Sequence, residues 1–186
     1  DEFHHADART YRKVIDHFEP LFLLGLTATP ERTDGGDLLA LCGENLVCTV
    51  NLFEGISEGA LAPFDYFGVP DEVSYENIPW RRLTEIELTR LVATRARNQN
   101  ALDQLRKHGG TRILAFCVSI SHADDAARFF AEQGYRVVTI HSGPGSAPRA
   151  ESIGRFEAGE LDMIVTVDVF NEGVDIPSVD TVLMLR

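Results

Sequence analysis

Residues 111–140, TRILAFCVSISHADDAARFFAEQGYRVVTI, decide the fold of this chain. An apolar run at 112–117 is followed by a helical pattern at 122–133 and by a second apolar run at 136–140. A strand, a helix and a strand within about 30 residues form a βαβ unit, whose two strands are parallel. The crossover in such a unit is right-handed, and helices cover both faces of the sheet. This stretch therefore predicts an α/β fold built on a parallel sheet.

The pattern predicts further elements on both sides of this stretch. From residue 61 onward these are a strand at 64–69, a loop at 70–82, helices at 83–108 and 147–158, and strands at 162–166 and 181–185. Before residue 61 they are helices at 6–17, 36–41 and 54–59 and strands at 21–26 and 46–52. Because the pattern changes near Leu61, we expect two parts, residues 1–60 and residues 61–186. The second part is expected to be a doubly wound sheet of about five strands.

Composition and charge narrow the class of protein. The chain has 186 residues, 44% of them hydrophobic, and the N-terminal residues resemble neither a signal peptide nor a transit peptide. It contains no run of 18 apolar residues, and its three cysteines lack CxxC spacing. We therefore expect a globular, cytoplasmic protein without a membrane partner. The net charge of −12 excludes a surface that is basic all over, so any contact with nucleic acid must be local.

Two adjacent carboxylates, Asp1 and Glu2, begin the chain, and His4 follows them before a helical pattern. In a nucleotide-hydrolysing site, one carboxylate at a strand end holds Mg²⁺, and a neighbouring carboxylate can polarise the attacking water. The alternative interpretation is a solvated acidic pair at the surface. The two residues alone do not separate these interpretations.

Two hydroxyl side chains, Thr27 and Thr29, lie in the segment LTATP at residues 26–30. They follow the strand expected at 21–26 and therefore occupy its carboxyl end, the edge at which open α/β sheets bind ligands. One predicted helix separates them from Asp1 and Glu2, which favours a shared edge. A plain strand-to-loop turn is the alternative.

A third polar segment, TVDVFNEGVDIP at residues 166–177, follows the strand expected at 162–166. Gly173 permits a close approach of the backbone to a ligand. Asp175, two residues later, is suited to accept a hydrogen bond from a ribose hydroxyl, as an acidic residue does in dinucleotide-binding folds. An ordinary acidic loop is the alternative.

The segments DEFH, LTATP, ILAFCVSISHA, TIHSG and VTVDVFNEGVDIP resemble, in order and spacing, motifs II to V of superfamily 2 helicases of the DExH type. The resemblance extends over nearly the whole chain. Within that superfamily, the chain is most similar to bacterial ATP-dependent helicases related to restriction-enzyme translocation subunits. The resemblance implies RecA-like domains: residues 1–60 correspond to the C-terminal part of the first, ATP-binding domain, and residues 61–186 to most of the second.

The resemblance implies catalytic roles for the first two segments. Asp1 is expected to hold the Mg²⁺ that accompanies ATP, and Glu2 to orient and activate water. His4 is expected to join the ATP site to the coupling motif. Thr27 and Thr29 form that motif and connect the state of the nucleotide to domain closure.

The resemblance implies binding roles for residues of the second part. Gly173 and Asp175 are expected to face the nucleotide, with Asp175 in contact with the ribose. Ser119 and Thr166 are expected to contact the nucleic-acid backbone, where hydroxyls and amides bind phosphates without reading the sequence. The expected partner is nucleic acid, and DNA rather than RNA.

The expected activity is that of an ATP-driven motor on nucleic acid, in which ATP binds between the two domains. The chain contains no G-x-x-x-x-G-K-[ST] segment, and it ends before the motif whose arginines reach the γ-phosphate. We therefore expect a fragment that is inactive alone and that can self-associate through unpaired strand edges. The alternative is a non-catalytic, helicase-like module that binds nucleic acid or protein.

Overall fold

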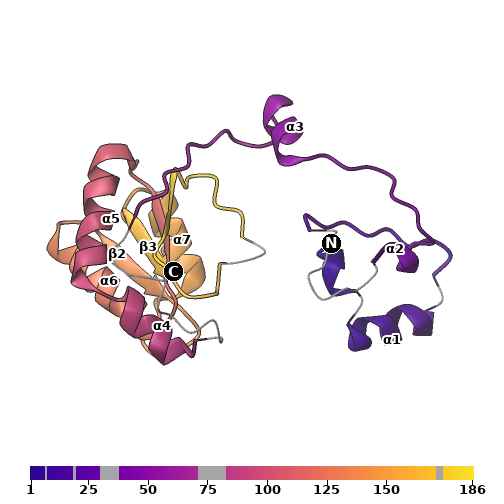
Figure 1. Cartoon of the computed structure of the whole chain (residues 1–186), viewed down its shortest axis with the longest axis horizontal. Helices are drawn as coiled ribbons and strands as arrows, with labels where there is room; N and C mark the ends of the chain where they lie inside the picture. The colour runs from indigo at the N-terminus through magenta and orange to yellow at the C-terminus, as the bar shows by residue number, and fades with distance from the viewer. Residues whose placement is uncertain (7, 19, 30–37, 71–82, 171–173) are drawn as a thin grey trace. The chain divides into compact units, whose positions relative to one another are not determined.

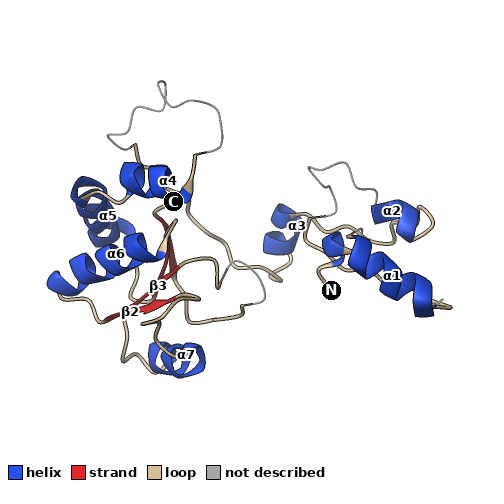
Figure 2. Cartoon of the chain, turned by 90° about the horizontal axis from the view of Figure 1, so that it is seen from below, coloured by secondary structure: helices blue, strands red, loops and turns tan. Residues whose placement is uncertain are grey.

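Figures 1 and 2 show a computed structural model that describes residues 1–6, 8–18, 20–29, 38–70, 83–170 and 174–186. The chain separates into two compact units, Asp1–Phe67 and Gly68–Arg186. The boundary expected near Leu61 remains a prediction. Among the described residues, no helix is long and apolar enough to cross a membrane.

The second unit is built on four parallel strands. These are β1 (Ile113–Phe116), β2 (Val137–Ile140), β3 (Met163–Thr166) and β4 (Thr181–Met184), in the order β2-β3-β1-β4. All three pairings are parallel. The prediction of an α/β fold with a parallel sheet is confirmed.

Helices cover both faces of this sheet (Figure 2). Helices α5 (Arg95–His108) and α6 (Ile120–Glu132) lie on one face, and α7 (Arg149–Glu157) lies on the other. Each face has its own apolar core. The core under α5 and α6 includes Leu102, Ala115, Phe130 and Met163, and the core under α7 includes Leu114, Phe116, Phe156 and Ile164.

The helix predicted over residues 83–108 is in fact two helices, α4 (Glu85–Val92) and α5. The hydroxyl of Thr94 accepts a hydrogen bond from the Arg97 N–H at 3.2 Å and caps the start of α5. A threonine in this position satisfies N–H groups that have no partner within the helix. The predicted single helix was wrong because the apolar spacing continues across this cap.

The predicted strands at 21–26, 46–52 and 64–69 are also wrong, because the structure has no strand at these described residues. Leu21 and Phe22 are exposed, at 107% and 80%. A β-strand forms only when its backbone hydrogen-bonds to a neighbouring strand. An apolar run indicates that a segment is suited to a strand, but it does not show whether a neighbouring strand is present. Among its described residues, the second unit consequently has four strands instead of about five.

The first unit consists of short helices joined by irregular backbone. They are η1 (Phe3–His5), α1 (Arg9–Phe18), α2 (Leu38–Leu41) and α3 (Leu52–Ser57). The amide of Asn51 and the carboxylate of Glu54 cap each other's backbone N–H groups at the start of α3, at 3.0 and 2.9 Å. This capping box begins a helix where the strand at 46–52 was predicted to end.

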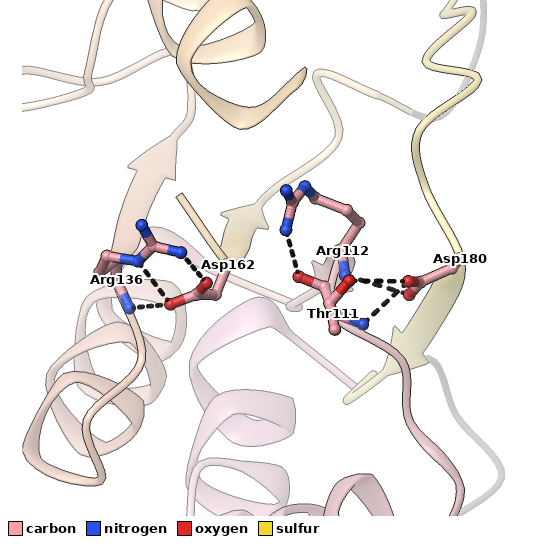
Figure 3. Close-up of polar contacts among 5 residues, drawn as sticks. All are labelled: Thr111, Arg112, Arg136, Asp162 and Asp180. Atoms are coloured by element: carbon pink, nitrogen blue, oxygen red, sulfur yellow. Dashed lines mark hydrogen bonds and ion pairs between the residues drawn. The ribbon is translucent and has the colours of Figure 1, made fainter. Parts of the chain in front are cut away.

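Two aspartates stabilise the amino-terminal edge of the sheet (Figure 3). Asp162 forms a two-pronged pair with the guanidinium of Arg136 and accepts the Arg136 backbone N–H at 2.8 Å. Asp180 accepts the backbone N–H groups of Thr111 and Arg112 at 2.8 and 3.1 Å. These contacts tie the start of β2 to β3 and the start of β1 to β4.

Both aspartates are stabilised in their charged form. The side-chain hydrogen bond from Arg136 lowers the pKa of Asp162 below its usual range, against the opposing effect of burial. Burial raises the pKa of Asp180, but the N–H groups of Thr111 and Arg112 and two hydroxyls lower it further, so the net shift is downward. A carboxyl whose pKa is lower in the folded state stabilises the fold above its unfolded pKa and loses that effect as the pH falls.

Asp162→Asn is expected to lower the melting temperature by about 2–4 °C at pH 7. The difference from the wild type should shrink as the pH falls below about 4, where the wild-type carboxylate also becomes protonated. Thermal unfolding from pH 7 to pH 2 measures it. Asp125→Asn, which breaks the exposed pair with Arg128 on α6, is the matched control and should change little. A difference for Asp162→Asn that does not depend on pH would contradict the electrostatic explanation.

Candidate functional site

The segments DEFH and LTATP lie against each other in the first unit. The N–H of Phe3 donates to the carbonyl of Leu26 at 2.9 Å. The ring of Phe3 lies against Gly25, where an added Cβ would come within 2.4 Å of Phe3 Cδ1. Gly25 is therefore required by this close approach, which brings together segments more than 20 residues apart in the sequence.

His4 and Thr27 connect these segments through their side chains. The Nδ1 atom of His4 lies 3.0 Å from Thr27 Oγ1 and 3.4 Å from Glu2 Oε2. The hydroxyl of Thr27 already accepts the Thr29 N–H at 3.1 Å, so its own proton can be donated to a neutral His4. A protonated His4 instead donates to Thr27 or to the Glu2 carboxylate. His4 therefore lies within reach of both the Thr27 hydroxyl and the Glu2 carboxylate.

The backbone at Glu2 is in the left-handed conformation, with φ of 50°. Such a conformation is unfavourable for a residue with a side chain and is found most often where surrounding contacts impose it. Here the contacts of Phe3 with Leu26 and of His4 with Thr27 follow directly.

Asp1 is exposed and Glu2 is partly exposed. Mg²⁺ in nucleotide sites is held by one or two carboxylates together with water and substrate phosphates, so these hard oxygen donors fit that ion. In the described part of the chain, no group of three or more His, Cys, Asp or Glu side chains is placed to hold a metal. A site closed by protein ligands alone is thus not formed by the described residues.

Ser119 is buried, with 3% of its surface exposed, and caps the start of α6. Its hydroxyl accepts the N–H of His122 at 3.2 Å and a hydrogen bond from the Thr89 hydroxyl of α4 at 2.8 Å. The side chain therefore joins α4 to α6. Its predicted contact with nucleic acid remains a prediction, and the contact with Thr89 was not anticipated from the sequence.

Thr166 is fully buried at the carboxyl end of β3. Its hydroxyl donates to the carbonyl of Ile140 at the end of β2, at 2.9 Å. In this conformation the hydroxyl stabilises the pairing of two strands. Its predicted contact with nucleic acid also remains a prediction.

Asp175 is exposed, between Val174 and Ile176, which pack on the core under α7. A carboxylate held between two anchored residues is available to a ligand. Gly173 lies outside the described residues. The predicted nucleotide contact of both residues remains a prediction.

His122, in the first turn of α6, is a buried titratable residue. Only 1% of its surface is exposed, and burial, followed by the positive charge of Arg97, lowers its pKa to about 4. The imidazole is therefore neutral near pH 7. Its Nδ1 accepts the backbone N–H of Val118 at 3.5 Å, at the start of α6.

The chain matches two family models at its two ends. Residues 97–186 match the helicase conserved C-terminal domain, and residues 1–32 match the type III restriction enzyme, res subunit. The putative ATP-dependent helicase IRC3 of Saccharomyces cerevisiae is 24% identical over the whole of this chain, which covers 29% of that protein. The 51.5 kDa protein of a Lactococcus phage is 23% identical, again over the whole chain, which covers 41% of it.

Other relatives match only part of the chain. DEAD-box ATP-dependent RNA helicase 5 of Arabidopsis thaliana is 29% identical over 53% of this chain and 19% of its own length. The crystal structure of the Pyrococcus furiosus Hef helicase domain superposes with a TM-score of 0.40 and 20% identity, over 48% of this chain and 18% of that one. The chain thus spans less than half the length of each of these proteins.

Proposed function

Because this chain belongs to the superfamily 2 helicases, related to restriction-enzyme-type subunits, we propose that it is part of an ATP-dependent motor that moves along nucleic acid. DNA is the proposed partner, in keeping with the match of residues 1–32 to a restriction-enzyme subunit. The 186 residues by themselves are proposed to be inactive, and the activity belongs to the full-length protein.

The residues of the first unit divide the chemistry among them. Asp1 holds Mg²⁺, and this ion neutralises negative charge on the phosphates of ATP. Glu2 orients the attacking water and accepts its proton. His4 contacts both Glu2 and Thr27, so protonation of Glu2 alters the hydrogen bonds of His4 and thereby the position of Thr27. Thr29 supports Thr27 through its backbone N–H.

The observation that supports this function best is the contact of His4 with Thr27. It joins side chains 23 residues apart at 3.0 Å and also lies within 3.4 Å of the Glu2 carboxylate. A solvated acidic pair has no need of such a network. A motor needs one, because hydrolysis at the carboxylates must be transmitted to the rest of the protein.

The second unit supplies contacts to both ligands. Asp175 accepts a hydrogen bond from the ribose of the nucleotide. The start of α6, which Ser119 caps, presents backbone N–H groups of the kind that bind phosphates of nucleic acid. Ser119 and Thr166 hold this edge of the sheet, and local contacts of this kind are compatible with a net charge of −12.

The test is phosphate release by the full-length protein with Mg²⁺, measured alone and with single-stranded DNA, double-stranded DNA or RNA. Stimulation by DNA greater than that by RNA is expected. It should weaken as salt rises, because phosphate contacts release counterions. Greater stimulation by RNA contradicts DNA as the partner, and no hydrolysis under any condition contradicts the motor.

A further inference from the structure

Arg186 reaches across the carboxyl edge of the sheet in the second unit. It follows β4, and its guanidinium lies over the ring of Phe116, the last residue of β1, at 5.4 Å from the ring centre. It also lies 3.7 Å from the carboxylate of Asp168, two residues beyond β3. One side chain thereby contacts the ends of two other strands.

Asp168 begins the loop that follows β3, and its backbone is left-handed, with φ of 56°. Aspartate tolerates this conformation better than most residues but still needs contacts that impose it. Arg186 supplies such a contact from outside the loop. The ion pair is largely exposed, at 76% for the Asp168 side chain, so its contribution to global stability is small.

The loop after Asp168 is anchored a second time. Phe170 is buried in the core under α7, and the guanidinium of Arg149 lies over its ring at 5.0 Å from the centre. Ile176 belongs to the same core, as does Phe116, on which Arg186 stacks. The residues on both sides of Asp175 and the aromatic ring under Arg186 therefore share one packed cluster.

We propose that Arg186 is a positioning residue for the nucleotide. Arg186 stacks on Phe116, whose core also contains Ile176, and pairs with Asp168. Through these contacts it stabilises the described residues 168–170 and 174–176, among them Asp175, which contacts the ribose. This inference rests on the proposed function and extends it to a residue and an ion pair that the sequence motifs did not single out.

The test uses the full-length protein with Arg186→Met, Arg186→Lys and Asp168→Asn. Arg186→Met is expected to raise KM for ATP about tenfold with kcat changed less than about threefold, as for a contact that binds substrate and transition state alike. Arg186→Lys keeps the positive charge but loses the planar group that stacks on Phe116. Its KM for ATP should therefore lie between those of the wild type and Arg186→Met. Because both side chains act in one pair, the double variant Arg186→Met/Asp168→Asn should be no worse than Arg186→Met alone.

A second measurement does not depend on activity. Hydrogen exchange of the amides at 168–170 and 174–176, without nucleotide, should be faster in Arg186→Met than in the wild type. The control is Arg128→Met, which removes a similarly exposed Arg–Asp pair on α6 and should leave KM and exchange unchanged. If Arg186→Met does not fold, Asp168→Asn should still show the rise in KM and the faster exchange.

The outcomes separate the two proposals. If the wild type is active and Arg186→Met has the same KM for ATP and the same hydrogen exchange, the inference is overturned but the proposed motor function stands. If Arg186→Met does not fold, the same result in Asp168→Asn has the same meaning. A full-length wild type that hydrolyses no ATP overturns the proposed function and, with it, the nucleotide role of Arg186. A fall in kcat at constant KM overturns the positioning role in favour of a direct catalytic one.

Discussion

Glu2→Gln in the full-length protein is expected to reduce kcat for ATP hydrolysis by about 10²- to 10⁴-fold, the range typical of a lost general base. Glutamine keeps the size of the side chain and can still hydrogen-bond, but it cannot accept a proton from the attacking water. Binding of Mg²⁺ and ATP should be largely retained, because Asp1 keeps its carboxylate. Phosphate release with and without DNA measures the rate, and a fluorescent ATP analogue measures binding.

Glu58→Gln is the matched control. Glu58 follows α3 in the same unit and is exposed, so the same change of charge there should leave hydrolysis unaffected. An equal loss in both variants would indicate a general effect of charge. A full-length protein indifferent to Glu2→Gln would refute the role assigned to DEFH.

The second unit could be predicted well from the sequence because its strands pair with one another inside the unit. Strands 112–117, 136–140, 162–166 and 181–185 were expected, and each corresponds to a strand that pairs within the unit. Short apolar runs alternate there with amphipathic helices, so each predicted strand has a neighbouring strand within the same unit. Two expectations for the part from residue 61 onward were wrong: the strand at 64–69 and the undivided helix at 83–108. Thr94, which caps the start of α5, is a helix-capping residue visible in the sequence.

The first unit could not be predicted in the same way. An apolar run indicates that a segment is suited to burial, but it does not indicate which other segment will pair with it. Residues 21–26 and 46–52 have this composition, yet the structure provides no neighbouring strand among the described residues and leaves Leu21 and Phe22 exposed. Local signals succeeded where the partner is nearby, as in the capping box of Asn51 and Glu54.

Within the candidate site, the proximity of motifs could be predicted from the sequence, but the contacts of individual side chains could not. The proximity of DEFH to LTATP was expected from the order of the elements, and the structure brings His4 and Thr27 together at 3.0 Å. The burial of Ser119 and Thr166 was not expected, because a hydroxyl in a motif gives no sign of which carbonyl or N–H it will meet. Arg186 was missed because its contacts depend on the ends of three strands, which only the assembled sheet brings together.

The 186-residue chain alone is expected to release no measurable phosphate from ATP, at least about 10³-fold below the full-length protein. Asp1 and Glu2 can position Mg²⁺ and water, but no segment of the chain has the G-x-x-x-x-G-K-[ST] pattern whose amides and lysine hold the β- and γ-phosphates. A single arginine finger is worth about 10³ to 10⁵ in kcat in P-loop GTPases, so loss of the phosphate cradle is expected to be at least as severe.

Phosphate release by the isolated chain, beside the full-length protein at equal concentration, measures this difference. The isolated chain with Glu2→Gln reports the background from contaminating ATPases, because it has the same purification history. Equal, low signals from both chains agree with the prediction. A signal from the wild-type chain that disappears with Glu2→Gln would mean that these residues hydrolyse ATP without a phosphate-binding loop, and the division of roles proposed for Asp1 and Glu2 would then have to be replaced.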